Sequence, residues 1–194
     1  MTRRGYTFVE VLLVLAVLAV LAGLAWPSVL RFRDEQAIKD AAERVRSELD
    51  RTRFRAIDSG LAYQFRYETD GRRFIAIPAE REALAAPAGT VTQATSNLRV
   101  YAGEVAEGLT FEPAPGAARV GEKVEADWLA GLSDVSALQQ ASWSPAILYR
   151  PDGTGTTAEF RLIDEDRRYI DLTVRELTGM AASGRLRKET GLWD

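Results

Sequence analysis

An uncharged apolar segment is the first feature of the hydrophobic pattern. The twenty residues from Val11 to Leu30 carry no charge, whereas Arg3 and Arg4 precede them. Twenty residues at about 1.5 Å each form a helix of about 30 Å, which matches the hydrocarbon core of a bilayer. The pattern therefore predicts a transmembrane helix within residues 6–30.

Beyond residue 30 the apolar positions recur at helical spacing. They are Ile38, Ala41, Ala42, Val45, Leu49, Ala56 and Ile57. Charged residues fill the positions between them, which is typical of a helix with one buried stripe and one solvated face. Ser59-Gly60 is a typical helix end. We therefore expect one nearly continuous helix from about Tyr6 to Asp58, whose part over residues 31–58 is amphipathic and lies on a globular domain.

Strand-like alternation begins after this helix. Residues 61–67 and 74–77 flank the turn signal Asp70-Gly71 and predict a β-hairpin. Residues 98–101 and 109–111 are short strand candidates, 113–121 has the proline and glycine content of a loop, and 124–140 has room for one short helix. Trp128 and Trp143 are expected to pack in the core. The topology of residues 79–142 is not predicted.

The C-terminal part predicts an antiparallel meander. Strands are expected at residues 146–149, 158–163 and 169–174, with a tight turn at Pro151-Asp152-Gly153. No Lys-Ser or Lys-Thr pair follows these glycines, so the turn is not a phosphate-binding loop. The predicted fold class is α+β: a long N-terminal helix, its first half transmembrane, packed on an antiparallel β-sheet domain formed by residues 59–194.

The composition removes several classes of function. The 194 residues include no cysteine and no histidine, which excludes disulfides, thiolate metal sites and catalytic triads of the usual kind. We expect no enzyme activity, no cofactor and no metal; a membrane-tethered hydrolase using carboxylates alone is an alternative without a supporting motif. Beyond residue 30 there are 23 basic and 27 acidic residues, which does not favour general nucleic-acid binding.

Glu10 is the unusual residue of the apolar segment. A carboxylate at the centre of a membrane helix costs about 2.5–3.5 kcal/mol, and less near the interface. Two interpretations follow. Either Glu10 lies at the level of the lipid headgroups and marks the start of the span, or it meets a positive partner inside a protein assembly.

The residues around Glu10 resemble the processing site of type IV pilins and type II secretion pseudopilins. Gly5 stands before Tyr6-Thr7-Phe8-Val9-Glu10, and Pro27 follows. In that family a glycine precedes the cut, an aromatic residue follows it, and glutamate and proline occupy mature positions five and twenty-two. The resemblance implies that residues 1–5 are a leader, that prepilin peptidase cuts between Gly5 and Tyr6 and methylates the Tyr6 amine, and that Glu10 pairs with the N-terminus of a neighbouring subunit.

Other interpretations of the segment remain open. An ordinary secretory signal would use Gly23-Leu24-Ala25 as a weak cleavage site, and a plain anchor would not be cut. Arg3 and Arg4 favour a cytoplasmic N-terminus, although Arg31 and Arg33 weaken that bias. Pro27 removes the helical hydrogen bond to the carbonyl of Gly23, so a weak point or kink is expected there.

The C-terminal pattern resembles the GspH/FimT group of minor pseudopilins and minor pilins. A strand is followed by Pro151-Asp152-Gly153-Thr154, two further strands and Leu177-Thr178-Gly179. The resemblance implies a minor pseudopilin of a type II secretion pseudopilus, held in the bacterial inner membrane with its C-terminal domain in the periplasm. Its implied partners are other major and minor pseudopilins and secreted substrate.

A basic segment near the C-terminus supports an alternative function. Gly184-Arg185-Leu186-Arg187-Lys188 resembles the Gly-Arg-x-Arg feature of FimT-like minor type IV pilins, some of which bind DNA. Two arginines on a strand with one residue between them point the same way, which allows them to bind adjacent phosphates. The other interpretation is an edge strand protected by exposed charge.

Overall fold

The computed structural model describes residues 8–79, 100–129 and 132–189, except for the side chains of residues 22–32. Predictions for Gly5, Tyr6 and residues 80–99 therefore lie outside the described residues. The chain divides into two compact units, Met1–Ala37 and Ile38–Asp194.

One helix, α1 (Phe8–Ser59), contributes residues to both units and is 52 residues long. Its C-terminal end confirms the prediction made from Ser59-Gly60. Gly60 has a φ of 68°, in the left-handed region that glycine adopts without a steric penalty. The Ser59 hydroxyl donates to the carbonyl of Arg55 in the last turn, at 2.6 Å.

The apolar stripe of α1 in the second unit is buried as predicted, apart from its last member. Ile38, Ala41, Ala42, Val45, Leu49 and Ala56 are buried, whereas Ile57 is 41% exposed. The predicted solvated face also has an exception, because Glu48 is only 3% exposed. Glu48 lies three residues after Val45 and therefore at the flank of the stripe, where Arg55 Nη1 contacts its carboxylate at 2.6 Å.

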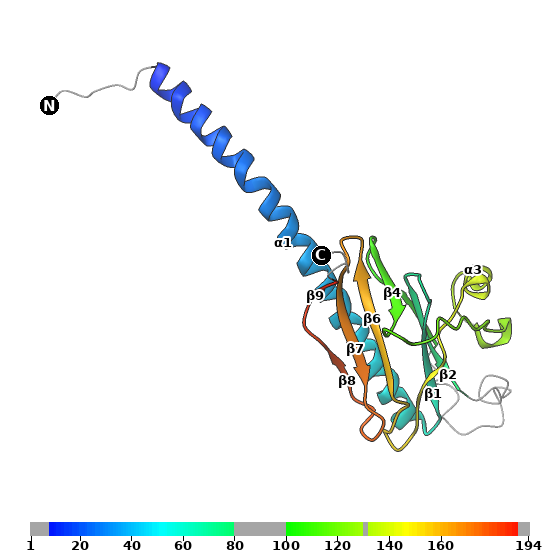
Figure 1. Ribbon diagram of the computed structural model, residues 1–194. Helices are drawn as coiled ribbons and strands as arrows, with labels where there is room; N and C mark the ends of the chain where they lie inside the picture. Colours follow the sequence, from blue (N-terminus) through cyan, green and yellow to red (C-terminus); the bar gives the residue numbers. More distant parts are fainter. Residues whose placement is uncertain (1–7, 80–99, 130–131, 190–194) are drawn as a thin grey trace. The chain divides into compact units, whose positions relative to one another are not determined.

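The first sheet has the strand order β3-β2-β1-β5, and all of its pairings are antiparallel. Figure 1 labels its two central strands, β1 and β2. Its strands are β1 (Tyr63–Tyr67), β2 (Arg73–Pro78), β3 (Tyr101–Glu104) and β5 (Ile147–Tyr149). β1 and β2 form the hairpin predicted around Asp70-Gly71, and Asp70 adopts a φ of 57° in the turn. The strand expected at residues 98–101 instead begins at Tyr101 within the described residues.

The second sheet has the order β4-β6-β7-β8, with β9 also paired to β7. Its strands are β4 (Leu109–Pro113), β6 (Ala158–Asp164), β7 (Arg168–Val174), β8 (Ala181–Ser183) and β9 (Arg187–Lys188). The predicted C-terminal meander is wrong in one respect, because β5 pairs with β1 and not with β6. Ile147 and Tyr149 bury their side chains in the same core as Tyr63 and Phe65, so the turn at Pro151 connects the two sheets.

The main core lies between α1 and the inner faces of both sheets. Aromatic rings contributed by β1, β2, β4 and β6 join the two sheets; Tyr67 and Phe160, for example, have ring centroids 4.5 Å apart. Such pairs add about 0.5–1.5 kcal/mol beyond the burial of their area. The packing therefore confirms the expected α+β arrangement of a helix on antiparallel sheets.

A second, smaller core covers the outer face of the first sheet. Its buried members are Ile75, Ile77, Val124, Leu129, Leu138, Ala141 and Trp143. The segment after β4 supplies this cover through η2 (Ala126–Leu129) and α3 (Val135–Gln140), where only one helix was predicted. Trp143 is fully buried as expected and donates from Nε1 to the carbonyl of Leu138 at 2.9 Å, whereas Trp128 is half-buried against this core.

Candidate functional site

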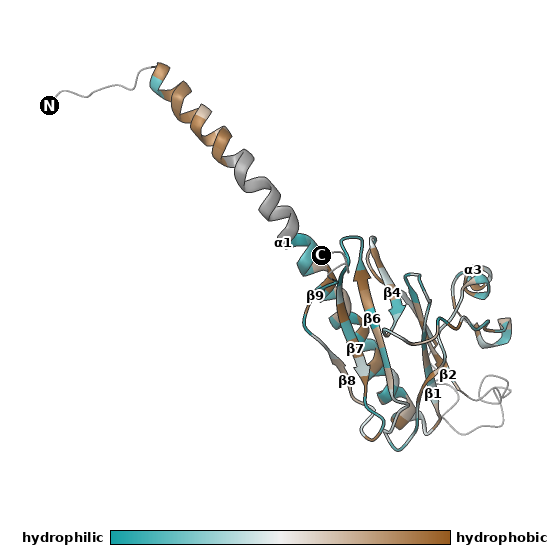
Figure 2. Cartoon of the chain, in the orientation of Figure 1, coloured by the Kyte–Doolittle hydropathy of each residue, from teal (hydrophilic) through white to brown (hydrophobic). Residues whose placement is uncertain are grey.

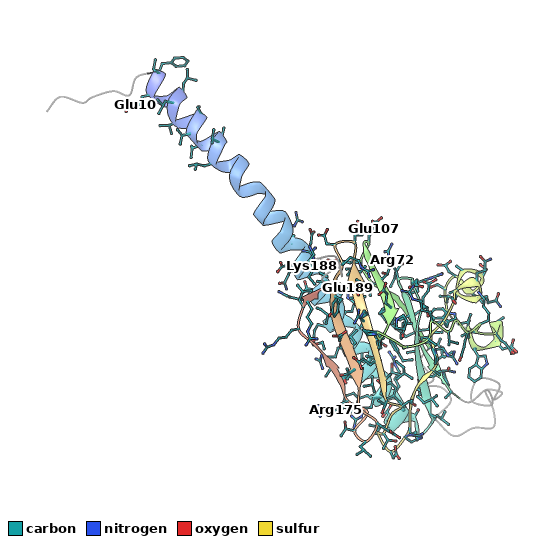
Figure 3. The ribbon with its side chains drawn as sticks, viewed as in Figure 1. Glu10, Arg72, Glu107, Arg175, Lys188 and Glu189 are labelled. Carbon is teal, nitrogen blue, oxygen red and sulfur yellow. The ribbon has the colours of Figure 1, made fainter. Side chains whose placement is uncertain are left out.

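Glu10 lies in the first turn of α1 with an exposed side chain (Figure 3). It is the only charged residue between Phe8 and Leu30. A carboxylate in the first turn of a helix interacts favourably with the unpaired N–H groups and the helix dipole, by about 0.3–1 kcal/mol. The helix end therefore offsets part of the cost of placing a charge beside an apolar segment. The predicted partner of Glu10, the amine of Tyr6, lies outside the described residues.

The apolar segment of α1 exposes large hydrophobic side chains on every side. From Phe8 to Leu21 they are 48–78% exposed, and Figure 2 shows this part of the helix in hydrophobic colours. A shallow groove on its surface is lined by Leu13, Ala16, Val17, Val20 and Leu21. These residues recur every three or four positions, which is the spacing of a helix–helix contact surface, and Ala16 allows a close approach of backbones.

Within the described part of the chain, no helix is both long enough and apolar enough to cross a membrane. The span predicted within residues 6–30 lies partly outside the described residues, since Tyr6, Thr7 and the side chains from Ala22 to Leu30 are not described. Gly23 and Pro27 belong to α1, which is helical through both positions. The weak point expected there stays a prediction.

The basic segment is only partly a strand. Arg187 and Lys188 form β9, opposite Tyr169 and Arg168 of β7, whereas Arg185 precedes the strand. Gly184 donates to the carbonyl of Asp171 at 2.7 Å. Two residues, 185 and 186, therefore stand opposite the single residue 170, as in a β-bulge. The prediction that Arg185 lies on one strand together with Arg187 is therefore wrong.

Two carboxylates, those of Asp171 and Glu189, lie at the basic segment. Arg185, Arg187 and Lys188 are exposed, and Asp171 lies 4.0 Å from Arg187 Nη1. Glu189 follows and contacts both Arg161, at 3.5 Å, and Arg167. Figure 3 places Lys188 and Glu189 together, with Arg175 at the other end of this unit. The local positive charge is therefore smaller than the sequence of the segment indicates.

Arg161 of β6 is buried and contacts two residues of β7. Arg161 is 7% exposed, its guanidinium lies 4.2 Å from the ring centroid of Tyr169, and Nη2 is 3.6 Å from Asp171. Cation–π contact and ion pairing offset the cost of burying this charge. Asp171 therefore interacts with two arginines, Arg161 and Arg187.

A cleft of about 420 Å³ between β3 and α3 was missed by the sequence analysis. It is lined by Arg73, Ala102, Gly103, Glu104, Ser133, Asp134, Ala137 and Leu138. It could not be predicted because all of its lining residues except Arg73 come from two segments of residues 79–142, for which the pattern gave no topology. Among the described residues, no group of three or more acidic side chains is arranged to hold a metal ion.

The N-terminal segment matches a known family. Residues 1–26 match the family described as the prokaryotic N-terminal methylation motif. The matched residues include Gly5, Tyr6 and Glu10. The chain thus combines this N-terminal motif with a long helix packed on antiparallel sheets.

The chain is also similar to solved structures of minor pseudopilins and minor pilins. Two of these structures are of the minor pseudopilin EpsH from the type 2 secretion system of Vibrio cholerae, and their sequences are 15% and 17% identical to this chain. The two matches cover 81% and 80% of this chain and 99% of each EpsH chain, with TM-scores of 0.45 and 0.48. The type IV minor pilin FimU of Pseudomonas aeruginosa shares 16% identity over 82% of this chain and 92% of its own, with a TM-score of 0.41. No curated protein matches the chain.

Proposed function

We propose that this protein is a minor pseudopilin subunit of a type II secretion pseudopilus, with a structural role in secretion across the outer membrane. The observation that carries the proposal is the methylation motif over residues 1–26, with Glu10 five positions after Gly5. The protein then spans the bacterial inner membrane once, with its N-terminus in the cytoplasm and its C-terminal domain in the periplasm. Its partners are prepilin peptidase, other major and minor pseudopilins and secreted substrate.

The proposed assembly step is an ion pair between subunits. Cleavage after Gly5 frees the amine of Tyr6, and this positive group meets Glu10 of an adjacent subunit. Two unit charges 4 Å apart interact by about 4 kcal/mol at an effective dielectric constant of about 20, which compensates the cost of an acid beside lipid. The groove lined by Leu13, Val17 and Leu21 supports contact with a neighbouring helix, and the Glu10 pair fixes the register of that contact.

Intact mass tests the processing step. The full-length chain is expressed with and without prepilin peptidase and extracted from membranes. We expect the peptidase to remove Met1 to Gly5 and to add one methyl group, and we expect Gly5→Ala to block both changes. Protein that still begins at Met1 in the presence of active peptidase would refute the proposal.

Exchange of Glu10 tests the assembly step. We expect Glu10→Leu to remain cleavable but to enter filaments at least about tenfold less, because a factor of ten corresponds to about 1.4 kcal/mol, a fraction of the pair's energy. Val11→Leu is the matched control, since it changes the neighbouring residue without changing charge. Equal incorporation of both variants, measured by co-purification with sheared filaments, would show that Glu10 has no assembly role.

Deletion of the gene distinguishes the proposed secretion role from its alternative, a FimT-like minor type IV pilin in pilus assembly or DNA uptake. Loss of secreted enzymes from the medium supports the first role, and loss of surface pili or of transformation supports the second. The exposed cations Arg185, Arg187 and Lys188 are the observation that favours DNA contact. A salt-sensitive shift of duplex DNA that is lost in the double variant Arg185→Ala/Arg187→Ala would establish it.

A further inference from the structure

Among the described residues, the outer edge of strand β3 differs from the outer edges of β4 and β5. The edge of β4 is closed by the β1–β2 turn, where Asp70 donates to Phe111 and Phe111 donates to Gly71. The edge of β5 is closed by the turn after it, where Thr156 donates to Leu148 at 2.8 Å. Within the described residues no group pairs with β3 on the side away from β2.

The antiparallel ladder identifies the backbone groups that face this edge. Val105 donates to the carbonyl of Arg72 at 3.0 Å, so this pair is of the hydrogen-bonded kind. Hydrogen-bonded and non-hydrogen-bonded pairs alternate along an antiparallel ladder. The pairs of Gly103 and Tyr101 with β2 are therefore hydrogen-bonded, and the N–H and C=O groups of Ala102 and Glu104 point outward. β3 thus offers two donors and two acceptors to a further strand.

The cleft beside β3 supplies a site for one side chain of such a strand. Its walls combine apolar surface from Ala102, Ala137 and Leu138 with the carboxylate of Asp134. Asp134 is exposed, sits in the left-handed region with a φ of 57°, and makes no side-chain hydrogen bond to the helix that it precedes.

The other charges at this cleft are already paired. Arg73 binds Glu68 through two hydrogen bonds of 2.9 and 2.7 Å, and Arg72 contacts Glu104 at 3.1 Å. No cation of the described residues contacts Asp134. The cleft therefore has an uncompensated negative charge beside an apolar wall, which suits a lysine or arginine with its aliphatic stem.

We propose that the open edge of β3 and the adjoining cleft bind an extended segment of a partner protein by strand addition. Main-chain hydrogen bonds to Ala102 and Glu104 hold the segment, and a lysine or arginine of that segment enters the cleft and pairs with Asp134. The proposal goes beyond the assembly role of α1, because it assigns a second interaction surface to the β domain.

Site-directed photo-crosslinking in cells tests this surface on the full-length chain. A benzophenone side chain is placed at Ser133, at the rim of the cleft, in cells that retain the assembly genes. The control position is Glu159, which is exposed on β6. We expect an adduct at position 133 only, and mass spectrometry should map it to a partner segment that contains a lysine or arginine.

Two substitutions at position 104 separate the backbone contribution from the charge. Glu104→Pro removes an N–H that faces outward and leaves the ladder to β2 intact, since proline is tolerated on edge strands. Glu104→Ala loses the same carboxylate but keeps the N–H. We expect the adduct to fall about three- to tenfold in Glu104→Pro relative to Glu104→Ala, as for loss of one hydrogen bond. If Glu104→Pro fails to fold, Asp134→Lys tests the site, and it should reduce the adduct more than Asp134→Asn does.

Four results would overturn the proposal: equal adducts at positions 133 and 159, equal yields in Glu104→Pro and Glu104→Ala when both fold, no loss in Asp134→Lys, or an adduct that maps to residues 80–99 of the same chain. None of them bears on cleavage after Gly5. Failure of this surface and failure of the processing step are therefore distinguishable.

Discussion

Arg53 donates a hydrogen bond from Nε to the backbone carbonyl of Gly153, which lies 2.9 Å away and 100 residues later in the chain. Gly179 lies at the same point, where an added Cβ would meet both the Gly153 carbonyl and the side chain of Arg53. The last turns of α1 thus meet the β5–β6 and β7–β8 connections. These connections contain Pro151-Asp152-Gly153 and Leu177-Thr178-Gly179, so the structure gives a packing reason for both sequence features.

Loss of the Arg53 contact should destabilise the β domain. We expect Arg53→Ala to lower the free energy of unfolding by about 1–2 kcal/mol, since a hydrogen bond from a charged donor to a half-buried carbonyl is lost. Arg44→Ala is the control, because Arg44 is exposed on the same helix and its loss should cost less than about 0.5 kcal/mol. Urea unfolding of the full-length protein in detergent, followed by circular dichroism, measures both. Equal effects would refute a role for Arg53.

Gly179 should tolerate alanine much less well than Gly60 does. Both have positive φ, 58° and 68°, so alanine at either position has the cost of a left-handed backbone, about 1–2 kcal/mol. Only at Gly179 does the new Cβ also collide with backbone, whereas nothing lies within 4 Å at Gly60. We expect Gly179→Ala to cost at least about 1 kcal/mol more than Gly60→Ala. Similar melting temperatures of the two variants would contradict this.

Removing the hydroxyl of Tyr149 should stabilise the protein. This hydroxyl is buried and has no hydrogen-bond partner among the described residues, and burial raises the pKa of Tyr149. Tyr149→Phe removes an unsatisfied polar group, so we expect a gain of about 1 kcal/mol in the free energy of unfolding. Tyr63 is equally buried, but its hydroxyl is not among the buried side-chain atoms that lack a hydrogen-bond partner. Tyr63→Phe should therefore give no gain in the same unfolding experiment.

The Glu68–Arg73 pair should make stability depend on pH in the acid range. Hydrogen bonds from Arg73 lower the pKa of Glu68 below its ordinary value of 4.5. Because the folded-state pKa is the lower one, the stabilisation is fully present above the unfolded-state pKa and is lost as pH falls through the folded-state pKa. Melting temperatures between about pH 7 and pH 3 should fall more steeply in the wild type than in Glu68→Gln. Parallel curves would show that the pair contributes nothing measurable.

The features that the sequence predicted correctly depend on local signals. Gly60 ends α1 because its left-handed conformation suits glycine, and Asp70-Gly71 forms the β1–β2 turn for a similar reason. The N-terminal motif could also be recognised from the sequence, because Gly5 and Glu10 lie within one short segment. Spacing along the chain was sufficient in each case.

The features that it missed depend on contacts between distant segments. β5 pairs with β1 across more than eighty residues, and Glu48 is buried although the helical pattern placed it among solvated charges. The bulge before Arg187 arises from pairing with β7, so the spacing of Arg185 and Arg187 did not reveal it. That the outer edge of β3 has no partner among the described residues could be recognised only once the strand order was known.

The second core has a consequence for handling the protein. Ile75 and Ile77 are fully buried only because the segment that includes η2 and α3 covers them. A protease cut that released this segment would leave two isoleucines and their neighbours in contact with water on a sheet surface, which favours self-association. Truncated preparations should therefore be checked for aggregation before any oligomer is taken as native.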